Sequence, residues 1–376
     1  MKKSFLLIIM SVILVSSGLF ASGQQESAKT PETSESTETT EPAPDVVTIV
    51  DSKGRSVSIT QPVRKIAFSH YAIGDGLKIL NAWNLVVAKD GFSSDKVLFP
   101  GIDKLPPIAK AGSPYSLNYE ELYELEPDIL VTSDLPLPGF DDMVKKLGTD
   151  IPVVALDLQN PDTLTENLLK LGKLLGREEE AQEYIEWYNN LITNLSEKTA
   201  KLSDDEKTRI LQRTGMSGNL MTFTDDYSGI KLRNRITGSI NVAGTLPSKG
   251  GWVQSMDPEW IAVQDIDVIV NFDIVPRANG TGVDDEGSYK KYRDDLMAEP
   301  VFANTNAVKK GRFYMIANEF WGTMRNIIGF AYMAKWCHPE LFKDFDPEQV
   351  HQEYLTRFMR VDYDLDKHGV FVYPKE

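Results

Sequence analysis

Aromatic and basic side chains stand at or near the ends of apolar segments that predict buried strands. His70 and Tyr71 directly follow the apolar segment 65–69, and Arg213 lies near the end of the segment 209–214. Ligands of open α/β sheets bind at the carboxyl ends of the strands, so such positions are candidates for a binding site. The full candidate set is His70, Tyr71, Tyr115, Arg213, Tyr227, Trp252, Trp321 and Arg325. Aromatic faces combined with guanidinium groups suit a large, partly apolar complex that carries negative charge.

Metal chemistry at these positions is restricted to a few side chains. Tyr71 is a possible iron ligand, and His70 is a possible ligand of haem iron or cobalt. The other three histidines, His338, His351 and His368, fall in or after predicted C-terminal helices, where a structural role is expected. A zinc or manganese site needs several converging ligands, so no metal site is predicted, and no cofactor is expected.

Catalysis finds little support in the sequence. It holds no G-x-S-x-G elbow, no H-E-x-x-H pair, no Walker loop and no dinucleotide glycine fingerprint. The basic residues Lys231, Arg233 and Arg235 predict a solvated helix face. We therefore expect no catalytic residues and a binding protein instead of an enzyme.

Two stretches that lie 139 residues apart repeat one pattern. In the first, Glu120 stands eight residues before Asp128, which opens an apolar run; in the second, Glu259 stands eight residues before Asp267. Near-continuous β-branched and leucine residues suit a parallel strand covered on both faces, and the segment before each run suits a short helix. The repeat predicts two similar α/β lobes with a ligand cleft between them.

Length and composition agree with a two-lobed exported protein. The chain has 376 residues, a formal net charge of −15 and one cysteine, Cys337. The negative charge argues against nucleic acid as a partner. Residues 1–22 join two lysines, an apolar run and small residues, which predicts a signal peptide; an uncleaved anchor is the alternative. No cysteine follows that segment, so no lipoprotein anchor is expected. The protein is expected in the periplasm or on the outer face of the membrane.

The remaining segments divide the chain into five parts. Residues 23–45 are rich in Ser, Thr, Glu and Pro and predict a disordered acidic linker. Residues 46–160 predict an N-terminal α/β lobe, 161–202 connecting helices, and 203–376 a C-terminal α/β lobe. The predicted fold is α/β, with two similar three-layer lobes of mainly parallel sheet joined by one long rigid helix.

The chain resembles the substrate-binding proteins of ABC importers for iron-siderophore, haem and cobalamin complexes. The matching stretches are KAGSPYSLNYEELYELEPDILVTS (110–133), LGKLLGREEEA (171–181), GSINVAG (238–244), WVQSMDPEWIAVQDIDVIV (252–270) and AVKKGRFY (307–314). The resemblance implies a monomer that delivers a small-molecule metal complex to a permease with its ATPase. It also implies that Glu120 and Glu259 dock on the permease and that Trp252 lines the cleft.

The resemblance leaves the ligand open. Leu135 and Pro138 stand where some siderophore and cobalamin binders place an aromatic residue. We expect an iron complex, such as a siderophore-like chelate. Haem, cobalamin, or an oxyanion such as molybdate or tungstate are the alternatives, and a sensor domain is a further one.

Overall fold

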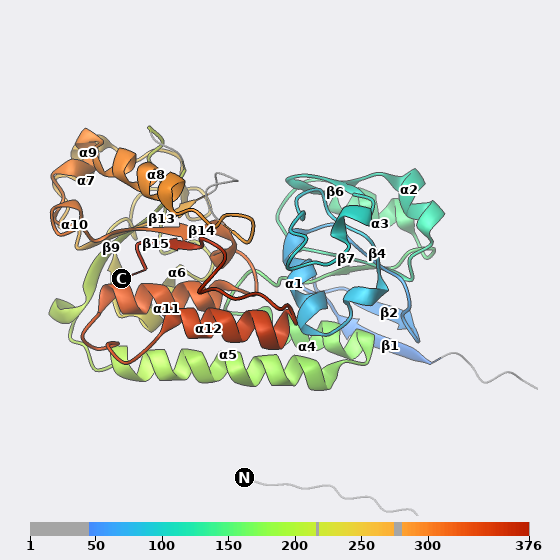
Figure 1. The fold of residues 1–376 in the computed structure, drawn as a ribbon. Coiled ribbons are helices and arrows are strands. Elements are labelled where there is room, and N and C mark those ends of the chain that lie inside the picture. The colour runs from blue at the N-terminus through green and yellow to red at the C-terminus, as the bar shows by residue number, and fades with distance from the viewer. Residues whose placement is uncertain (1–44, 216–217, 274–279, 376) are drawn as a thin grey trace, which may run out of the picture. The chain divides into compact units, whose positions relative to one another are not determined.

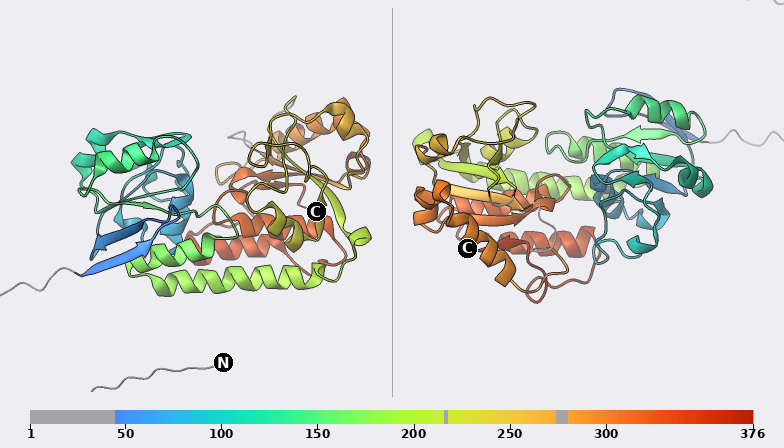
Figure 2. Two further views of the ribbon diagram at one scale, coloured as in Figure 1. Left: turned by 180° about the vertical axis from the view of Figure 1, so that it is seen from behind. Right: turned by 90° about the horizontal axis from the view of Figure 1, so that it is seen from above.

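The computed structural model describes residues 45–215, 218–273 and 280–375. The predicted signal peptide and nearly all of the predicted linker lie outside the described residues. Figure 1 labels many of the helices and strands of the described chain, and Figure 2 shows the same ribbon from behind and from above. No helix within the described ranges is both long enough and apolar enough to cross a membrane.

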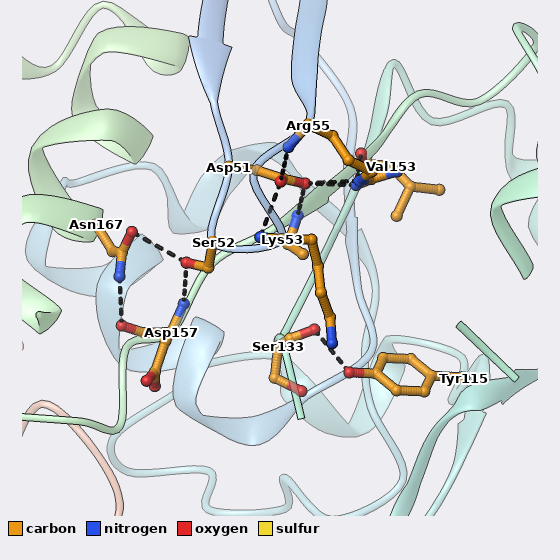
Figure 3. A network of polar contacts seen from close by, with 10 residues as sticks. Asp51, Ser52, Lys53, Arg55, Tyr115, Ser133, Val153, Asp157 and Asn167 are labelled. Atoms are coloured by element: carbon orange, nitrogen blue, oxygen red, sulfur yellow. Dashed lines mark hydrogen bonds and ion pairs between the residues drawn. The ribbon is translucent and has the colours of Figure 1, made fainter. Parts of the chain in front are cut away.

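The first lobe is built on a parallel sheet with the order β4-β3-β7-β8. Its elements are the hairpin β1 (Val46–Val50) and β2 (Ser56–Thr60), β3 (Ile66–Phe68), α1 (Tyr71–Ile79), η1 (Trp83–Leu85), β4 (Val86–Ala88), η2 (Ile102–Lys104), β5 (Ala109–Lys110), β6 (Ser113–Leu117), α2 (Tyr119–Leu125), β7 (Ile129–Thr132), α3 (Phe140–Leu147) and β8 (Val153–Ala155). The hairpin turn is fixed by Asp51, whose carboxylate accepts the backbone N–H groups of Lys53 and Arg55 (Figure 3). Arg55 also donates to the Val153 carbonyl at 2.9 Å, which joins the hairpin to β8.

The second lobe is built on a mixed sheet with the order β12-β10-β9-β13-β14-β15, in which β11 also pairs with β9. Its elements are η3 (Asp204–Glu206), β9 (Thr208–Thr214), β10 (Met221–Phe223), α6 (Ile230–Thr237), β11 (Ser239–Asn241), β12 (Trp252–Val253), α7 (Pro258–Ala262), β13 (Val268–Asp273), α8 (Gly287–Met297), α9 (Pro300–Ala303), α10 (Asn306–Lys309), β14 (Phe313–Ala317), η4 (Asn318–Phe320) and β15 (Val372–Tyr373). The central pairs β9-β13 and β13-β14 are parallel, as in the first lobe.

Alternation along the strands makes each lobe three layers deep. In β7, Ile129 and Val131 face a core shared with α1 and α4 (Leu164–Leu175), whereas Leu130 faces a second core under α2 and α3. In β13, Val270 faces the shared core, and Ile269 faces a third core under α7, α8, α9 and α10. Side chains of a strand point alternately to opposite faces, so both sheets are covered on both sides. The predicted fold class is confirmed.

The repeat seen in the sequence has a structural basis. Asp128, at the start of β7, accepts the backbone N–H groups of Arg64 and Lys65 at 2.6 and 2.8 Å. Asp267, at the start of β13, accepts the N–H group of Arg209 at 3.0 Å. In each lobe this carboxylate satisfies backbone donors where the neighbouring strand begins, which sets the register of the two strands.

Helices on one side of the molecule connect the lobes. They are α4 (Leu164–Leu175), α5 (Glu178–Thr199), α11 (Asn326–Cys337) and α12 (Pro347–Glu353), and α12 continues into a π-helical turn, Tyr354–Phe358. Gly172 lies inside α4, whereas Gly176 ends that helix, because it takes the left-handed conformation with φ +61°. At roughly 1.5 Å per residue, the 22-residue α5 is about 33 Å long and packs against α4, α6 and α11.

Candidate functional site

A cavity of about 270 Å³ lies at the carboxyl ends of the first lobe's strands. The loop after β3 contributes Ser69 and His70, and the first residue of α1, Tyr71, also lines the cavity. From the second lobe, Tyr227 lines the cavity. The cavity therefore lies in the cleft between the lobes that the repeat predicts. A larger open groove of about 960 Å³ runs between β2 and β8 but contains none of the predicted binding residues.

His70 and Tyr71 line the cavity as the sequence predicted. His70 is the N-cap of α1, and its Nδ1 accepts the N–H of Ala72 at 3.4 Å. Burial lowers the pKa of His70 to about 4, so the ring is neutral near pH 7. Burial likewise raises the pKa of Tyr71, with further contributions from Tyr227, Asp75 and Asp90. The two rings contact each other with centroids 4.3 Å apart.

Gln159 is a cavity residue that the sequence did not reveal. Its side-chain amide donates to the Tyr71 hydroxyl at 2.7 Å and to the Gly322 carbonyl at 3.1 Å. Gly322 belongs to the second lobe, so this single side chain ties the two walls of the cleft together. Gln159 lies in the loop between β8 and α4, which follows a strand end of the first lobe, as the segment with His70 and Tyr71 does.

An aromatic cluster stands behind Tyr227. The Phe223 ring stacks on Trp321 with centroids 4.1 Å apart and meets Trp252 edge-on at 4.6 Å. Tyr227 contacts Trp252 and Trp321 at 6.2 and 5.9 Å. Trp321 is 9% exposed and Trp252 is partly buried. Of the aromatic residues predicted in the second lobe, Tyr227 therefore lines the cavity, and the two tryptophans pack against the Tyr227 ring.

Arg233 anchors this cluster and corrects one prediction. The sequence placed it on a solvated helix face, yet it is 2% exposed, with its guanidinium 3.8 Å from the Trp321 ring centre. It donates to the Gln212 side chain at 3.0 Å. Burial lowers the pKa of Arg233 to about 9. Its neighbours Lys231 and Arg235 are the exposed residues of that helix turn.

Tyr115 does not face the cavity, contrary to the prediction. Its ring lies in the outer core of the first lobe, edge-on to Phe140 at 5.3 Å. Its hydroxyl donates to the carbonyls of Ser133 and Leu135 at 3.0 and 2.9 Å, the first of which is drawn in Figure 3. Tyr115 lies inside β6, and the pleat turns its ring toward α3 while the preceding residue, Pro114, lines the cavity.

Arg213 is also structural. It is fully buried in β9, donates to the Asn271 side chain and to the Asn219 carbonyl, and lies 5.2 Å from the Phe302 ring centre. Burial lowers its pKa to about 10. The strand's alternation turns this side chain toward the outer helices, away from the cavity. Met216, in the loop after β9 that is expected to face the cleft, lies outside the described residues.

Arg325 forms ion pairs with two carboxylates of the protein and does not line the cavity. Its Nε lies 2.9 Å from Asp75 on α1, and its Nη1 lies 2.7 Å from Glu319. Burial by itself would lower the pKa of Arg325, but Asp75 and Glu319 outweigh that effect and raise it. The prediction of a ligand-binding arginine is corrected, because a buried ion pair across 250 residues of sequence uses the guanidinium.

The rim of the cavity adds residues of several kinds. Phe92 is 55% exposed and meets the Tyr71 ring edge-on at 6.1 Å. Asp90 is 1% exposed because its carboxylate accepts the N–H groups of Phe92 and Ser93. Lys110 is exposed, and Leu135 completes the apolar side.

No group of three or more His, Cys, Asp or Glu side chains suited to a metal ion occurs among the residues that the structure describes.

A sequence model of periplasmic binding proteins matches residues 66–319, more than half of the chain. The chain belongs to the periplasmic binding protein family. Its members are substrate-binding proteins of ABC importers and not enzymes, which confirms both the resemblance seen in the sequence and the expectation of a non-catalytic protein.

Individual periplasmic binding proteins are similar over most of the chain. The molybdate-binding protein MolA of Haemophilus influenzae is 23% identical over 354 residues, covering 85% of this chain and 90% of MolA. The TroA-like periplasmic binding protein FepB of Veillonella parvula superposes with a TM-score of 0.71 at 20% identity, covering 87% and 99% of the two chains. CeuE of Helicobacter pylori in a nickel–histidine complex gives 0.67 at 20% identity, covering 85% and 97%.

In this periplasmic binding protein, the two repeated glutamates lie at the surface. Glu120 is exposed in the first turn of α2, whose N-cap is Asn118. Glu259 is exposed in the first turn of α7, whose N-cap is Asp257. Neither makes a side-chain ion pair within the described ranges, so both carboxylates are open to a partner. The acidic side chains also stabilise the helix dipoles by roughly 0.3 to 1 kcal/mol each.

Proposed function

We propose that this periplasmic binding protein is exported, captures an iron chelate in the interlobe cavity and delivers it to the permease and ATPase of an ABC importer. The observation that carries the proposal is the composition of the cavity wall. Phe92, Tyr71 and Tyr227 present aromatic surface, while Arg213 and Arg325 are bonded within the protein. A partly apolar organic complex fits such a wall better than a bare ion does.

Cavity size supports the same choice. A volume of about 270 Å³ is roughly nine times the share of one water molecule in the liquid, about 30 Å³. A tetrahedral oxyanion has only four oxygen atoms and would leave most of that space to water. An organic chelate fills it and contacts the exposed ring of Phe92 at the rim.

An oxyanion is the second candidate. The similarity to MolA, a molybdate-binding protein, over 85% of this chain favours it. Lys110 at the rim and the donors of His70 and Tyr71 would serve an oxyanion as well as a chelate. Haem and cobalamin remain alternatives to the siderophore-like chelate, and the titration below includes both.

The cargo is tested by tryptophan fluorescence. The purified protein is titrated with ferric hydroxamate and catecholate complexes, haemin, cobalamin, molybdate and tungstate. Trp252 and Trp321 report binding because both contact Tyr227. Saturable binding of a ferric complex supports the proposal. Binding of molybdate or tungstate alone would replace it with the oxyanion function.

Delivery is tested on the two surface glutamates. We propose that Glu120 and Glu259 each form a charge-assisted contact with a basic side chain of the permease. The Glu120→Ala/Glu259→Ala variant should therefore bind ligand as the wild type does but support little uptake into cells. Glu121→Ala, which alters another carboxylate of the same helix turn, is the matched control. Unchanged uptake by the double variant would contradict the docking assignment.

A further inference from the structure

His70 presents a hydrogen-bond donor to the cavity. A neutral imidazole carries its proton on one nitrogen only, and the other nitrogen is an acceptor. The Nδ1 atom of His70 accepts the N–H of Ala72 as the N-cap of α1, so the proton resides on Nε2. His70 lines the cavity, and no partner for Nε2 occurs among the hydrogen bonds of the described chain.

Tyr71 also presents a donor, and Gln159 is the reason. The Gly322 carbonyl is only an acceptor, which fixes the Gln159 amide with its nitrogen toward Gly322. The same nitrogen lies 2.7 Å from the Tyr71 hydroxyl, so the phenol oxygen accepts and its own proton is not used in that bond. Within the described residues the Tyr71 proton has no acceptor, and it is available to a ligand.

We propose that the cavity recognises its ligand by donating hydrogen bonds from His70 Nε2 and Tyr71 Oη to oxygen atoms of the ligand, and that neither side chain coordinates a metal. This inference rests on the proposed function and narrows it. The matching ligand is a complex in which the chelator's own oxygens fill the coordination shell of the iron and also form its outer surface. A chelate that leaves open positions on the metal would find no ligand here.

The surroundings of Tyr71 agree with a donor role. Iron would bind the phenolate, and burial together with Tyr227, Asp75 and Asp90 raises the pKa of Tyr71 and opposes its ionisation. Gln159 acts in the opposite sense, because its N–H also stabilises a phenolate, but burial outweighs this effect. Asp90 is turned toward backbone N–H groups, so it does not supply a free carboxylate for a metal.

The tautomer of His70 is the first test, and it needs no ligand. Long-range ¹H–¹⁵N spectra of the uniformly labelled, ligand-free protein distinguish Nε2–H from Nδ1–H rings. The His70→Asn variant identifies the His70 signals by their loss, and asparagine retains an N-cap acceptor. The proposal expects a neutral Nε2–H ring at pH 6. A neutral Nδ1–H ring, or a charged ring at that pH, would overturn it.

The second test is visible absorption with ferric nitrilotriacetate, a chelate that leaves two iron positions open. Coordination by a tyrosine would produce a phenolate-to-iron charge-transfer band. The proposal expects no such band from wild type. A band that persists in Tyr123→Phe, a surface control on α2, and disappears in Tyr71→Phe would refute the donor role.

The third test uses whichever ferric complex binds in the fluorescence titration. Tyr71→Phe should weaken that binding about tenfold or more, because it removes a hydrogen bond to a charged oxygen. An unchanged affinity would overturn the proposal. If no ferric complex binds, the proposed cargo fails, whereas the spectra of the ligand-free protein still decide whether His70 is a donor.

Discussion

Removal of Arg325 should destabilise the protein strongly. Its guanidinium contacts Asp75 through Nε and Nη2 at 2.9 and 3.3 Å and Glu319 through Nη1 at 2.7 Å. The side chains of Arg325 and Asp75 are 8% and 1% exposed. Arg325→Met leaves the buried carboxylate of Asp75 and the 25% exposed carboxylate of Glu319 without a cation, and the stranded Asp75 charge makes the cost about 3 to 5 kcal/mol in the free energy of unfolding.

The surface residue Arg357 provides the matched control. It also contacts two carboxylates, Glu183 and Glu353, each at 2.8 Å, but its side chain is 41% exposed. Because water and salt screen such pairs, Arg357→Met should cost less than about 1 kcal/mol. Both variants replace an arginine with methionine, so the difference between their free energies of unfolding measures the effect of burial.

Urea unfolding followed by tryptophan fluorescence measures both variants. The Asp75→Asn/Arg325→Met double variant removes one of the stranded charges, so it should be less destabilised than the sum of the single variants by about 1 to 3 kcal/mol. The reasoning is refuted if Arg325→Met costs no more than Arg357→Met. The same result would return Arg325 to the group of candidate ligand-binding residues.

Three further perturbations test the described structure. Burial lowers the pKa of His351 to about 3, so below about pH 6.5 the unfolded state binds a proton that the folded state does not, and this residue alone should reduce the free energy of unfolding by about 2 kcal/mol from pH 7 to pH 5. Because the lowered pKa of His70 adds a loss of the same sign, His351→Phe should reduce the total loss by about 2 kcal/mol, whereas His368→Gln, at an exposed histidine, should leave it unchanged, as measured by urea unfolding at each pH. Gly251→Ala should cost about 1 to 3 kcal/mol more in the free energy of unfolding than Gly250→Ala, because both glycines have positive φ but only at Gly251 would a Cβ collide with the Tyr227 backbone. Equal thermal stabilities of the two variants would contradict this. Tyr115→Phe should lower the free energy of unfolding by about 1 to 3 kcal/mol, because the buried Ser133 carbonyl loses its donor, whereas the Leu135 carbonyl keeps the Lys53 ammonium; a loss below about 0.5 kcal/mol would count against that role.

The local pattern of the sequence predicted most of the architecture. The Glu-to-Asp repeat located β7 and β13, and the position of His70 and Tyr71 after an apolar segment placed them at the cavity. These are short-range signals, because strand periodicity and strand ends are encoded in neighbouring residues. The helix α8 was missed, although the spacing of Tyr289, Tyr292 and Leu296 follows one helical face.

The direction of individual side chains was decided by the tertiary structure. Tyr115 and Arg213 lie inside strands, so the pleat determined which face each side chain takes. Arg325 and Arg233 were assigned to solvent or ligand because their buried partners, Asp75 and the Trp321 ring, are distant in sequence. Gln159 gave no signal at all, since its importance comes from two acceptors that folding brings to one amide.

The sequence by itself therefore determined the repeat, the layers and the edge of the sheet at which the cavity lies. Only the folded structure decided which polar groups remain available there, because a guanidinium or carboxylate that finds a buried partner is no longer free to bind a ligand. Arg213 and Arg325 have partners within the protein, whereas the Nε2–H of His70 and the hydroxyl proton of Tyr71 are left unpaired by the described residues at the cavity.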